Sequence, residues 1–487
     1  MASKLVDPVN STQWLVVDLD GTLIRTDMLF ETFWLQASRD WTTPMRVLPD
    51  LLRGRAALKE RLASRIDVDA ATLPYNPEVI TLLENWRAAG GRTALVTASN
   101  QHLADGIAAH LGLFDEVHGS SAHDNLKGAR KAAFLDEHFG KGAYTYAGDS
   151  RADLEVWPSA GAIYTVEARP AVRQAAQDIA ARNQVEIRHI GSPRGSAKAW
   201  LKLLRPHQWL KNILVFVTLL VGHMFDWYSL LMALLAFISF SLVASSAYIN
   251  NDLLDLAADR VHPRKRKRPL ASGAVPIERG TVVWPLLLLA GAGVALLVGL
   301  KFFAVMAVYY VVTTAYSLKL KRYMVIDIFV LALLYTLRIF AGAVAIGVSP
   351  SIWLTAFSIF FFFSLAAVKR QAELVDASKT NRGEVAGRGY LLEDMPIISM
   401  MGLASGYVSV LVMVLYTNSP EVRELYASPR ILWGISGVLL CWITYMVMRT
   451  NRGEMHDDPV IFATRDTVSR IGGLFVVGLC VMAGVNW

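Results

Sequence analysis

The sequence contains little cysteine, and it does not begin with an apolar segment. Only two of the 487 residues are cysteines, Cys441 and Cys480, and both lie inside apolar runs. Two thiols in such places exclude a disulfide framework and a cysteine-based metal site, so we expect both to be packed side chains. Residues 1–10 are polar and lead directly into a strand-like segment, which is unlike a secretory signal peptide. We therefore expect the N-terminal part of the chain to remain in the cytoplasm.

Charged residues are also scarce. They make up 18% of the chain, whereas hydrophobic residues make up 54%, which excludes an ordinary soluble enzyme. The formal net charge of +7 is compatible with a nucleic-acid partner, but the basic residues cluster at the ends of apolar segments. That distribution is typical of membrane proteins and of sites for phosphorylated ligands, so we expect no nucleic-acid partner. The sequence does not indicate an oligomeric state.

Long apolar runs fill the chain after Trp209. A spanning helix needs about 20 apolar residues, and the sequence contains about nine candidates. They lie near residues 209–226, 229–250, 281–299, 302–318, 325–347, 352–368, 396–417, 430–449 and 468–486. Lysine and arginine concentrate in alternate loops, around residues 251–280, 319–324, 369–394 and 450–467. This positive-inside asymmetry predicts a multi-pass protein of the inner (plasma) membrane, with a cytoplasmic N-terminus and the C-terminus on the opposite side.

Composition divides the chain into three parts. Residues 1–187 have the composition of a soluble α/β domain, and residues 205–487 have that of an all-α membrane domain. Between them, residues 188–204 contain glycine, serine, proline and basic residues without periodicity. We expect this segment to be a linker that rests on anionic lipid headgroups.

Three strand ends in the N-terminal domain carry polar side chains. The strand WLVV is followed by Asp18 and Asp20, the strand ALVT ends at Thr97, and a third strand leads to Asp149. Lys131 opens a helix between the last two strands. Strands that alternate with helices predict a parallel sheet, whose ligands bind beyond the carboxyl ends of the strands. A carboxylate attacks a dianionic phosphate only where a metal and a lysine offset the repulsion, and the sequence supplies residues for both.

The motifs DLDGT and GDSRAD, with the threonine and the lysine between them, resemble the haloacid dehalogenase superfamily over residues 12–185. The resemblance implies a Rossmann-like α/β fold with a small helical cap over residues 27–73. It also implies Asp18 as the nucleophile on phosphorus and Asp20 as the general acid and base. The other implied roles are Thr97 and Lys131 as phosphoryl-oxygen ligands, Asp18, Asp20 and Asp149 as Mg²⁺ ligands, and Asp153 as a support for Lys131 or the metal. Lys127 is an alternative to Lys131, and a domain without activity is an alternative to a phosphatase.

The membrane domain carries three acids at the end of an apolar helix. Asp252, Asp255 and Asp259 fall on one helical stripe, with Asn251 beside it. Three like charges near hydrocarbon are costly, so we expect them to bind a divalent metal, and Mg²⁺ prefers carboxylate oxygens. A basic run follows and supplies charge for a diphosphate, or for lipid headgroups, through Arg264, Lys265, Arg266, Lys267 and Arg268.

The motif NDLLDLAADR resembles the NDxxDxxxD signature of the UbiA superfamily, and the resemblance covers about residues 200–487. It implies an all-helical fold with a central cavity in which Mg²⁺ bridges a diphosphate. The sequence departs from the UbiA prenyltransferases at their second acid motif, DxxxD, where residues 369–376 read KRQAELVD. The usual YxxxK spacing is also altered, because Tyr316 is followed by Lys319 and Lys321.

Four segments, RPHQWLKN, YSLKLK, KRQAEL and GEMHDDP, resemble one branch of the superfamily, the polyprenyl-phosphate phosphoribosyltransferases that include those acting on decaprenyl phosphate. This branch implies 5-phosphoribosyl diphosphate as the donor and a polyprenyl phosphate lipid as the acceptor. The residues that it implies for lipid phosphate and ribose 5-phosphate are Lys211, Lys321, Lys369 and Arg370.

Three further groups near this site have open roles. Asp327 lies on the same stripe as Arg338, so the two form either an internal ion pair or donor ligands. Glu373 and Asp376 bind a second metal or ribose hydroxyls, or they are solvated. We expect His262 and His456 to be structural or to contact phosphate, and not to bind metal.

Three functions are compatible with these motifs. The first is transfer of phosphoribose to a polyprenyl phosphate, after which the N-terminal domain removes the 5-phosphate from the product. The second is prenyl transfer from a prenyl diphosphate to an aromatic or other acceptor. The third is a lipid-binding scaffold without activity.

Overall fold

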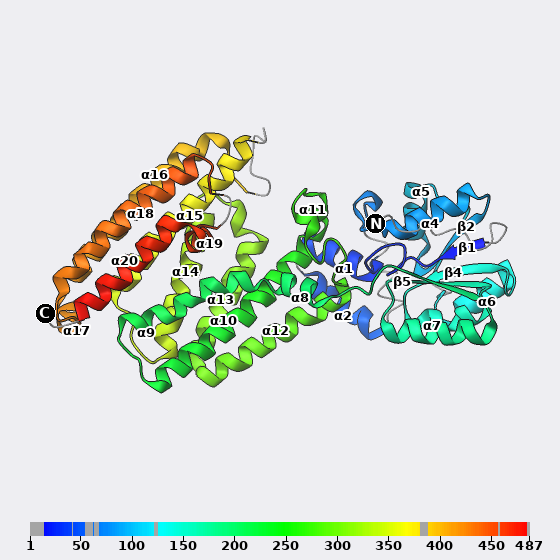
Figure 1. Ribbon diagram of the computed structural model, residues 1–487, viewed down its shortest axis with the longest axis horizontal. Helices are drawn as coiled ribbons and strands as arrows, with labels where there is room; N and C mark the ends of the chain where they lie inside the picture. The colour runs from blue at the N-terminus through cyan, green and yellow to red at the C-terminus, as the bar shows by residue number, and fades with distance from the viewer. Residues whose placement is uncertain are drawn as a thin grey trace. The chain divides into compact units, whose positions relative to one another are not determined.

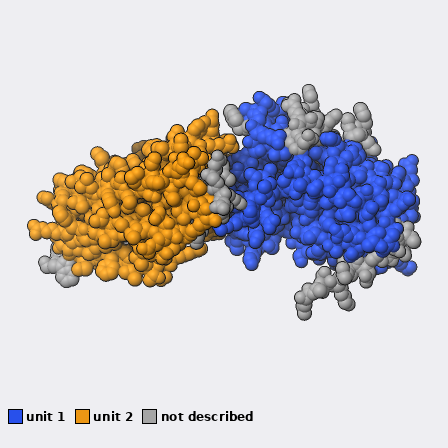
Figure 2. Space-filling model, turned by 90° about the horizontal axis from the view of Figure 1, so that it is seen from above, with its two compact units in different colours: residues 1–205, 248–285 blue, residues 206–247, 286–487 orange. Residues whose placement is uncertain are grey.

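The computed structural model describes residues 14–40, 42–53, 62, 68–120, 125–379, 388–455 and 458–484 (Figure 1). It divides into two compact units, residues 1–205 with 248–285 and residues 206–247 with 286–487 (Figure 2). The units do not follow the three parts predicted from composition, because the segment with the acid motif belongs to the unit of the N-terminal domain.

The first unit contains a six-stranded parallel sheet in the order β3-β2-β1-β4-β5-β6. The strands are β1 Trp14–Val17, β2 Arg92–Asn100, β3 Glu116–Ser120, β4 Tyr144–Gly148, β5 Ala162–Val166 and β6 Glu186–Ile190. β1, β4 and β5 are apolar runs that are buried almost completely, as expected for strands covered on both faces. The predicted α/β fold is therefore confirmed, and β2, β1 and β4 are neighbours in the sheet. Asp18 and Asp149 follow β1 and β4, whereas Thr97 lies inside β2, which continues to Asn100 beyond the predicted strand end.

Helices cover both faces of this sheet. Leu15 and Val17 pack with α4 Pro77–Ala88 and α5 Gln101–Leu111, whereas Val16 packs with α6 Ala129–Phe139 and α7 Pro170–Asn183. Successive residues of a strand point to opposite faces, which explains this division. The described part of the predicted cap is helical, with α1 Met28–Arg39, α2 Thr43–Arg53 and the 3₁₀ turn η1 Ala70–Thr72.

The segment predicted as a linker, residues 188–204, contains regular structure at both ends. β6 crosses the predicted domain boundary at residue 187 and pairs with β5 as far as Ile190. α8 occupies Ala197–Leu204, and the side chain of Ser196 caps its first turn. The segment predicted as a linker therefore contains part of a strand and a helix, each too short to show a periodicity in the sequence.

The rest of the first unit surrounds the acid motif. α10 Trp227–Leu254 ends there, and α11 Leu256–Val261, the 3₁₀ turn η5 Lys265–Lys267 and the start of α12 Ile277–Val298 follow. Arg260 of α11 makes a bidentate ion pair with Glu31 of α1, with N–O distances of 2.5 and 2.9 Å, and both side chains are buried. Trp34 donates a hydrogen bond to Thr281 at 2.8 Å. The cap helix of the N-terminal domain therefore packs on the segment that follows the acids.

In the described residues, eight helices are long and apolar enough to cross a membrane. They are Trp227–Leu254, Ile277–Val298, Leu300–Leu318, Ile326–Ala345, Ile352–Lys379, Leu392–Thr417, Pro429–Asn451 and Thr467–Gly484. Large apolar side chains are exposed along them, including Leu297, Ile352 and Leu474, as expected for a surface that faces lipid. The predicted all-α, multi-pass membrane domain is confirmed.

The first predicted span, residues 209–226, has a different form. The 3₁₀ helix η4 Pro206–Phe216 runs into the short helix α9 Val217–Val221. This segment is therefore not among the eight long apolar helices of the described residues, which correspond to the other eight predicted spans.

The other elements of the second unit connect these helices. They are α13 Leu300–Leu318, η6 Leu320–Arg322, α14 Ile326–Ala345, α15 Ile352–Lys379, η7 Leu392–Asp394, α16 Met395–Thr417, α17 Pro420–Leu425, η8 Pro429–Leu432, α18 Trp433–Asn451, α19 Pro459–Arg465 and α20 Thr467–Gly484.

Candidate functional sites

The predicted nucleophile and the predicted lysine are in direct contact. Asp18 follows β1, and its Oδ1 accepts a hydrogen bond from Lys131 Nζ at 2.6 Å. Lys131 lies in the first turn of α6, is buried, and also donates to the hydroxyl of Tyr146 at 3.0 Å. Lys127, the alternative, is exposed. The geometry favours Lys131 as the lysine of this site.

For each of Asp18 and Lys131, burial and the charge of the other residue shift the pKa in opposite directions. Burial raises the pKa of Asp18 to about 6, although the ammonium of Lys131 acts against this shift. Burial alone would lower the pKa of Lys131, but the carboxylates of Asp18 and Asp153 more than offset it and raise this pKa. The lysine therefore stays charged, which is what an oxygen-rich anionic ligand requires.

Three carboxylates converge beside the lysine. One oxygen each of Asp18, Asp149 and Asp153 lies within 4.8 Å of the other two. Asp153 already accepts hydrogen bonds from Tyr146, from the backbone of Asp149 and from Ser150, at 2.8 to 3.1 Å. Asp153 therefore holds the loop after β4 in place, and Asp18 and Asp149 remain as the better ligands.

The properties of Asp149 fit a divalent cation. Burial, followed by the charge of Asp153, raises its pKa well above the usual range, although the guanidinium of Arg194 acts against this shift. A Cβ on Gly21 would approach the carboxylate of Asp149 to 2.3 Å, and Gly21 has a φ of 82°, so only glycine fits here. Hard cations such as Mg²⁺ prefer carboxylate oxygens of this kind. The residues present therefore fit Mg²⁺.

Asp20 lies apart from this cluster of carboxylates. Its Oδ1 accepts from the backbone N–H of Met28 at 2.8 Å, and its Oδ2 accepts from Ser99 Oγ at 2.6 Å. Thr97, at the predicted strand end, is fully buried and accepts a hydrogen bond from the backbone N–H of Ser99. The hydrogen bond from Met28, the first residue of the cap helix α1, connects Asp20 to the cap. This position suits a general acid better than a metal ligand.

Sequence reasoning missed Arg194. Its Nη2 lies 3.2 Å from the carbonyl oxygen of Gly21 and 3.4 Å from Asp149 Oδ2. Its Nε lies 3.3 Å from Glu167, which also pairs with Arg25 at 2.5 Å. Arg194 belongs to the segment predicted as a linker, and no sequence motif connects it to the site. This guanidinium adds a second positive charge beside the carboxylates, after that of Lys131.

The acid motif is bent where a continuous stripe was predicted. α10 ends at Leu254, and Asp255 precedes α11 with a φ of −90° and a ψ of 8°. Even so, Asp252 and Asp259 meet at one guanidinium, because Arg268 Nη1 lies 3.0 and 2.6 Å from them. Asn251 Nδ2 donates to Asp255 at 3.0 Å. The helix predicted through the motif is therefore interrupted at Asp255, and Asp252 and Asp259 converge.

Arginines supply the counter-charge at this motif. Arg205 donates to both oxygens of Asp252 at 2.7 and 2.9 Å, and Asp252 is 2% exposed. Asp259 is 1% exposed, and its Oδ1 is buried without a hydrogen-bond partner; Lys265 Nζ is 4.0 Å away. Burial raises the pKa of Asp259, although Arg268 acts against this shift. A buried carboxylate oxygen without a partner fits a cation, and so Mg²⁺ fits here as well.

The basic run after the acids is exposed apart from Arg268. Arg264, Lys265 and Arg266 are exposed. His262 Nδ1 accepts hydrogen bonds from the backbone of Arg264 and Lys265 at 3.2 and 3.3 Å, so its role here is structural. His456, the second histidine considered, lies outside the described residues.

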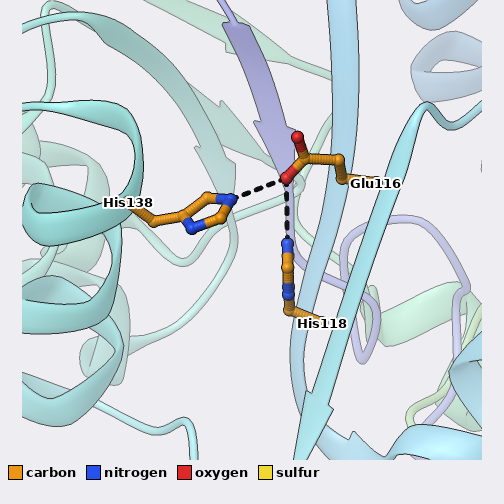
Figure 3. Close-up of side chains that lie close together, drawn as sticks. All are labelled: Glu116, His118 and His138. Atoms are coloured by element: carbon orange, nitrogen blue, oxygen red, sulfur yellow. Dashed lines mark hydrogen bonds and ion pairs between the residues drawn. The ribbon is translucent and has the colours of Figure 1, made fainter.

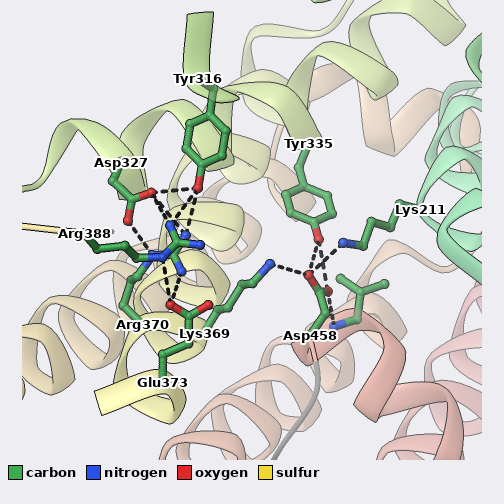
Figure 4. A network of polar contacts seen from close by, with 10 residues as sticks. Lys211, Tyr316, Asp327, Tyr335, Lys369, Arg370, Glu373, Arg388 and Asp458 are labelled. Atoms are coloured by element: carbon green, nitrogen blue, oxygen red, sulfur yellow. Dashed lines mark hydrogen bonds and ion pairs between the residues drawn. The ribbon is translucent and has the colours of Figure 1, made fainter. Parts of the chain in front are cut away.

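The second unit contains a polar cavity of about 490 Å³. Asp458 Oδ2 accepts from Lys211 Nζ at 2.7 Å and from Lys369 Nζ at 3.1 Å, and Tyr335 donates to both oxygens (Figure 4). The residues that line the cavity are His207, Gln208, Lys211, Lys369, Ala372, Glu373, Asp376, Asp458, Ile461 and Arg465. Two predicted phosphate ligands, Lys211 and Lys369, therefore share one cavity, and Asp458 is the carboxylate that sequence reasoning did not single out.

A second charge network adjoins Lys369 on α15 (Figure 4). Asp327 accepts from Arg370, from Arg388 at 3.0 Å and from Tyr316 at 2.7 Å, and it is fully buried. Glu373 accepts from Arg370 at 2.5 Å and from Arg388 at 3.1 Å. Two guanidinium groups therefore neutralise the two carboxylates.

The pair of Asp327 with Arg338, one of two readings of their shared stripe, does not form. Arg338 instead donates to Asn212 at 3.0 Å and to Tyr309 at 2.9 Å. Eleven residues of α-helix rise about 16 Å, so residues on one stripe at this separation are too far apart for an ion pair. Lys321, in η6, is half-buried and does not line the cavity.

Two family models match this chain. Residues 15–157 match the haloacid dehalogenase-like hydrolases, and residues 212–382 match the UbiA prenyltransferase family. The chain therefore carries a UbiA prenyltransferase family domain in its C-terminal part and a haloacid dehalogenase-like domain at its N-terminus. It is an enzyme of the UbiA kind with a hydrolase-type domain, as the two resemblances in the sequence implied.

Individual relatives match more of the chain. The uncharacterized protein y4nM of Sinorhizobium fredii is 40% identical over 96% of this chain and 90% of its own length. Nodulation protein NoeC of Azorhizobium caulinodans is 37% identical over 55% of this chain and 87% of its own length. Decaprenyl-phosphate phosphoribosyltransferase of Mycolicibacterium smegmatis is 36% identical over 39% of this chain and 61% of its own length. A solved UbiA homologue from Archaeoglobus fulgidus, bound to GPP and Mg²⁺, is 18% identical with a TM-score of 0.45, over 58% of this chain and 99% of its own.

Proposed function

We propose that the membrane domain transfers 5-phosphoribose from phosphoribosyl diphosphate to a polyprenyl phosphate, decaprenyl-like in kind, with Mg²⁺ as the cofactor. The observation that carries this proposal is the cavity in which Lys211 and Lys369 flank Asp458. Two ammonium groups held by one carboxylate suit a phosphate monoester, because the phosphate can take the place of the carboxylate between them. The similarity to decaprenyl-phosphate phosphoribosyltransferases supports the same substrate class.

The second acid position supports phosphate binding over metal binding. The UbiA prenyltransferases that the sequence resembles carry DxxxD at the second acid motif. In this chain Glu373 lies at that motif and is paired with Arg370 and Arg388. A carboxylate that shares two guanidinium groups has little charge left for a second metal. The guanidinium groups of Arg370 and Arg388 can also donate to phosphate oxygens, and we assign this region to the 5-phosphate of ribose.

The acid motif is the proposed place of the leaving diphosphate. Asp252 and Asp259, with Asp255, would hold Mg²⁺, which would offset the charge that develops on the diphosphate. Arg268 is already between two of these acids and would contact diphosphate oxygens, together with Asn251 and the exposed basic run. The bond from ribose C1 to the diphosphate breaks, and an oxygen of the lipid phosphate forms the new bond to C1, with inversion.

Diphosphate release tests this step. Purified protein in detergent with Mg²⁺ should release diphosphate from phosphoribosyl diphosphate only when polyprenyl phosphate is added. Asp259→Asn should lose this release, whereas Glu424→Ala, at an exposed site, should retain it. Release that needs no lipid acceptor, or that survives Asp259→Asn, would contradict the proposal.

Prenyl transfer is the second candidate, and the match to the UbiA prenyltransferase family favours it. In that case the prenyl diphosphate would be the donor, and an aromatic or other acceptor would be required. Turnover of a prenyl diphosphate, with no turnover of phosphoribosyl diphosphate, would support it against our first proposal. A lipid-binding scaffold would turn over neither donor.

We infer that the N-terminal domain removes the 5-phosphate from the phosphoribosyl lipid. Asp18 would attack phosphorus and Asp20 would protonate the leaving ribose oxygen, while Lys131, Arg194 and Thr97 would bind the phosphoryl oxygens. Asp18 and Asp149 would hold Mg²⁺, whose charge reduces the repulsion between carboxylate and phosphate. Asp18→Asn should let the phosphorylated lipid accumulate; an unchanged product would separate this domain from the reaction.

We also place the N-terminal domain in the cytoplasm and the C-terminus on the opposite side of the membrane. The basic loops that support this orientation belong to alternate connections of the spans. Cysteine-accessibility labelling at residues near each end of the chain tests it, and labelling of both ends from one side would contradict it.

A further inference from the structure

Three metal-ligating side chains meet on the N-terminal domain, outside both proposed sites (Figure 3). Glu116 and His118 lie on β3, and His138 lies in the last turn of α6. One ligand atom of each residue lies within 4.8 Å of the other two. No step of the proposed phosphatase or transferase reaction uses these residues.

The fold brings these three residues together in a simple way. β3 is the edge strand of the sheet, and Glu116 and His118 are two residues apart, so both side chains point to the same face. α6 covers that face and presents His138 from its C-terminal end. Nε2 of His118 and Nε2 of His138 lie 3.1 and 2.8 Å from the same oxygen, Glu116 Oε2.

Aromatic packing fixes the orientation of both imidazoles. Phe134 stacks on His138 with centroids 5.4 Å apart and lies 5.0 Å from His118. Phe139 contacts His138 edge-on at 4.7 Å, and the two imidazoles are 4.9 Å apart. Rings that are already held in place lose little conformational freedom on binding a ligand, so this geometry is prepared for a metal.

The chemistry of the three ligands selects among metals. Two imidazole nitrogens and one carboxylate suit Zn²⁺ and related transition metals, whereas Mg²⁺ prefers oxygen ligands alone. Ligand distances of about 2.0 to 2.2 Å require ligand atoms about 3.3 Å apart, so the two contacts of the imidazole nitrogens with Glu116 Oε2 must open by only a few tenths of an ångström. The side chain of His118 is 27% exposed, that of Glu116 34% and that of His138 41%, which leaves room for water as a fourth ligand.

We propose that Glu116, His118 and His138 bind one divalent transition-metal ion of the Zn²⁺ class, with water in the remaining position. The ion would connect the edge strand β3 to the C-terminal end of α6. Lys131 lies two turns earlier on the same helix, so the ion would also stabilise the helix that positions this lysine. The proposal does not depend on the function assigned to either catalytic site.

Metal stoichiometry tests this proposal. The full chain, purified in detergent and freed of metal with a chelator, is titrated with Zn²⁺ in excess Mg²⁺, which occupies the carboxylate sites. The double variant His118→Gln with His138→Gln should bind one equivalent fewer than the wild type. His102→Gln, an exposed histidine on α5, is the matched control and should bind as many equivalents as the wild type.

Three further measurements separate metal binding from a change in folding. Co²⁺ bound to the wild type should give visible absorption bands that the double variant lacks, while circular dichroism of the two apo proteins should agree. Zn²⁺ should also raise the melting temperature of the wild type and not that of the double variant. Equal stoichiometry in wild type and double variant would overturn the proposal and leave a hydrogen-bonded cluster only.

Discussion

Removal of the Asp458 carboxylate should leave two buried ammonium groups without their counter-charge. Lys211 and Lys369 have side chains that are 9% and 27% exposed, and both donate to Asp458 Oδ2. Burial alone would raise the pKa of Asp458, but the two lysines lower it well below its usual range, so the carboxylate is ionised. Breaking one partner out of a buried ion pair costs about 3–5 kcal/mol. We expect about 3 kcal/mol for Asp458→Ala, because Lys369 keeps some contact with water.

The same variant should respond more strongly to phosphate than the wild type. An anion that enters between the two lysines replaces the lost carboxylate, and binding at 100 times its dissociation constant adds about 2.7 kcal/mol of stability. Thermal unfolding in detergent, followed by tryptophan fluorescence with and without inorganic phosphate, measures both effects. Glu424→Ala, which removes an exposed carboxylate of the same unit, is the control and should change neither value. Equal stability and equal phosphate response in Asp458→Ala and the wild type would refute the cavity as a phosphate site.

Three further predictions follow from the N-terminal site and from the charge network around Asp327. Phosphatase activity at low Mg²⁺ should fall as the pH drops through about 6, because attack on phosphorus requires ionised Asp18. Added Mg²⁺ should move this acidic limb of the pH–activity profile to lower pH. An acidic limb that Mg²⁺ does not move would argue against Asp18 as the titrating group. Lys131→Met should lower phosphatase turnover about 100-fold or more, whereas Lys127→Met should leave it nearly unchanged. Equal effects of the two substitutions would contradict the assignment of Lys131 as the lysine of the site. Asp327→Asn should lower the free energy of unfolding by about 3–5 kcal/mol, because it removes one of the two carboxylates that pair with fully buried Arg370. Thermal unfolding measures this change. A change below about 1 kcal/mol would mean that Glu373 alone balances the charge of Arg370.

The N-terminal site was predictable because its residues follow strands. Parallel strands bring their carboxyl ends to one edge, so the positions of Asp18 and Asp149 after β1 and β4 were enough to predict that the two acids lie close together. Arg194 was not predictable in this way, because it reaches the site from an irregular segment after the last strand. Contacts of that kind depend on how the chain returns to the sheet, and a local pattern does not record it.

The acid motif shows where a periodicity argument fails. A stripe calculated at 100° per residue assumes an unbroken helix, but the helix ends at Leu254 and starts again after Asp255. Asp252 and Asp259 nevertheless meet, because Arg268 from the following loop joins them. The residue types were therefore sufficient to indicate a charged site, although its geometry depends on a partner that lies outside the motif.

The cavity of the second unit was predicted only in part. Lys211 and Lys369 were indicated by similarity to a family motif, and they lie in one cavity. Asp458 is brought between them from a loop 89 residues beyond Lys369, and Arg388 reaches Asp327 from another loop. Such pairings between distant segments are set by helix packing, which the hydrophobic pattern of a membrane helix leaves undetermined.

A mass spectrum of the lipid product tests the central claim most directly. The protein would be incubated with Mg²⁺, phosphoribosyl diphosphate and polyprenyl phosphate, and the lipids extracted. We predict a lipid heavier by ribose with the wild type and by phosphoribose with Asp18→Asn, and no new lipid with Asp259→Asn. A lipid that remains unmodified by any sugar, across several chain lengths, while a prenyl diphosphate is consumed under the same conditions, would contradict the account.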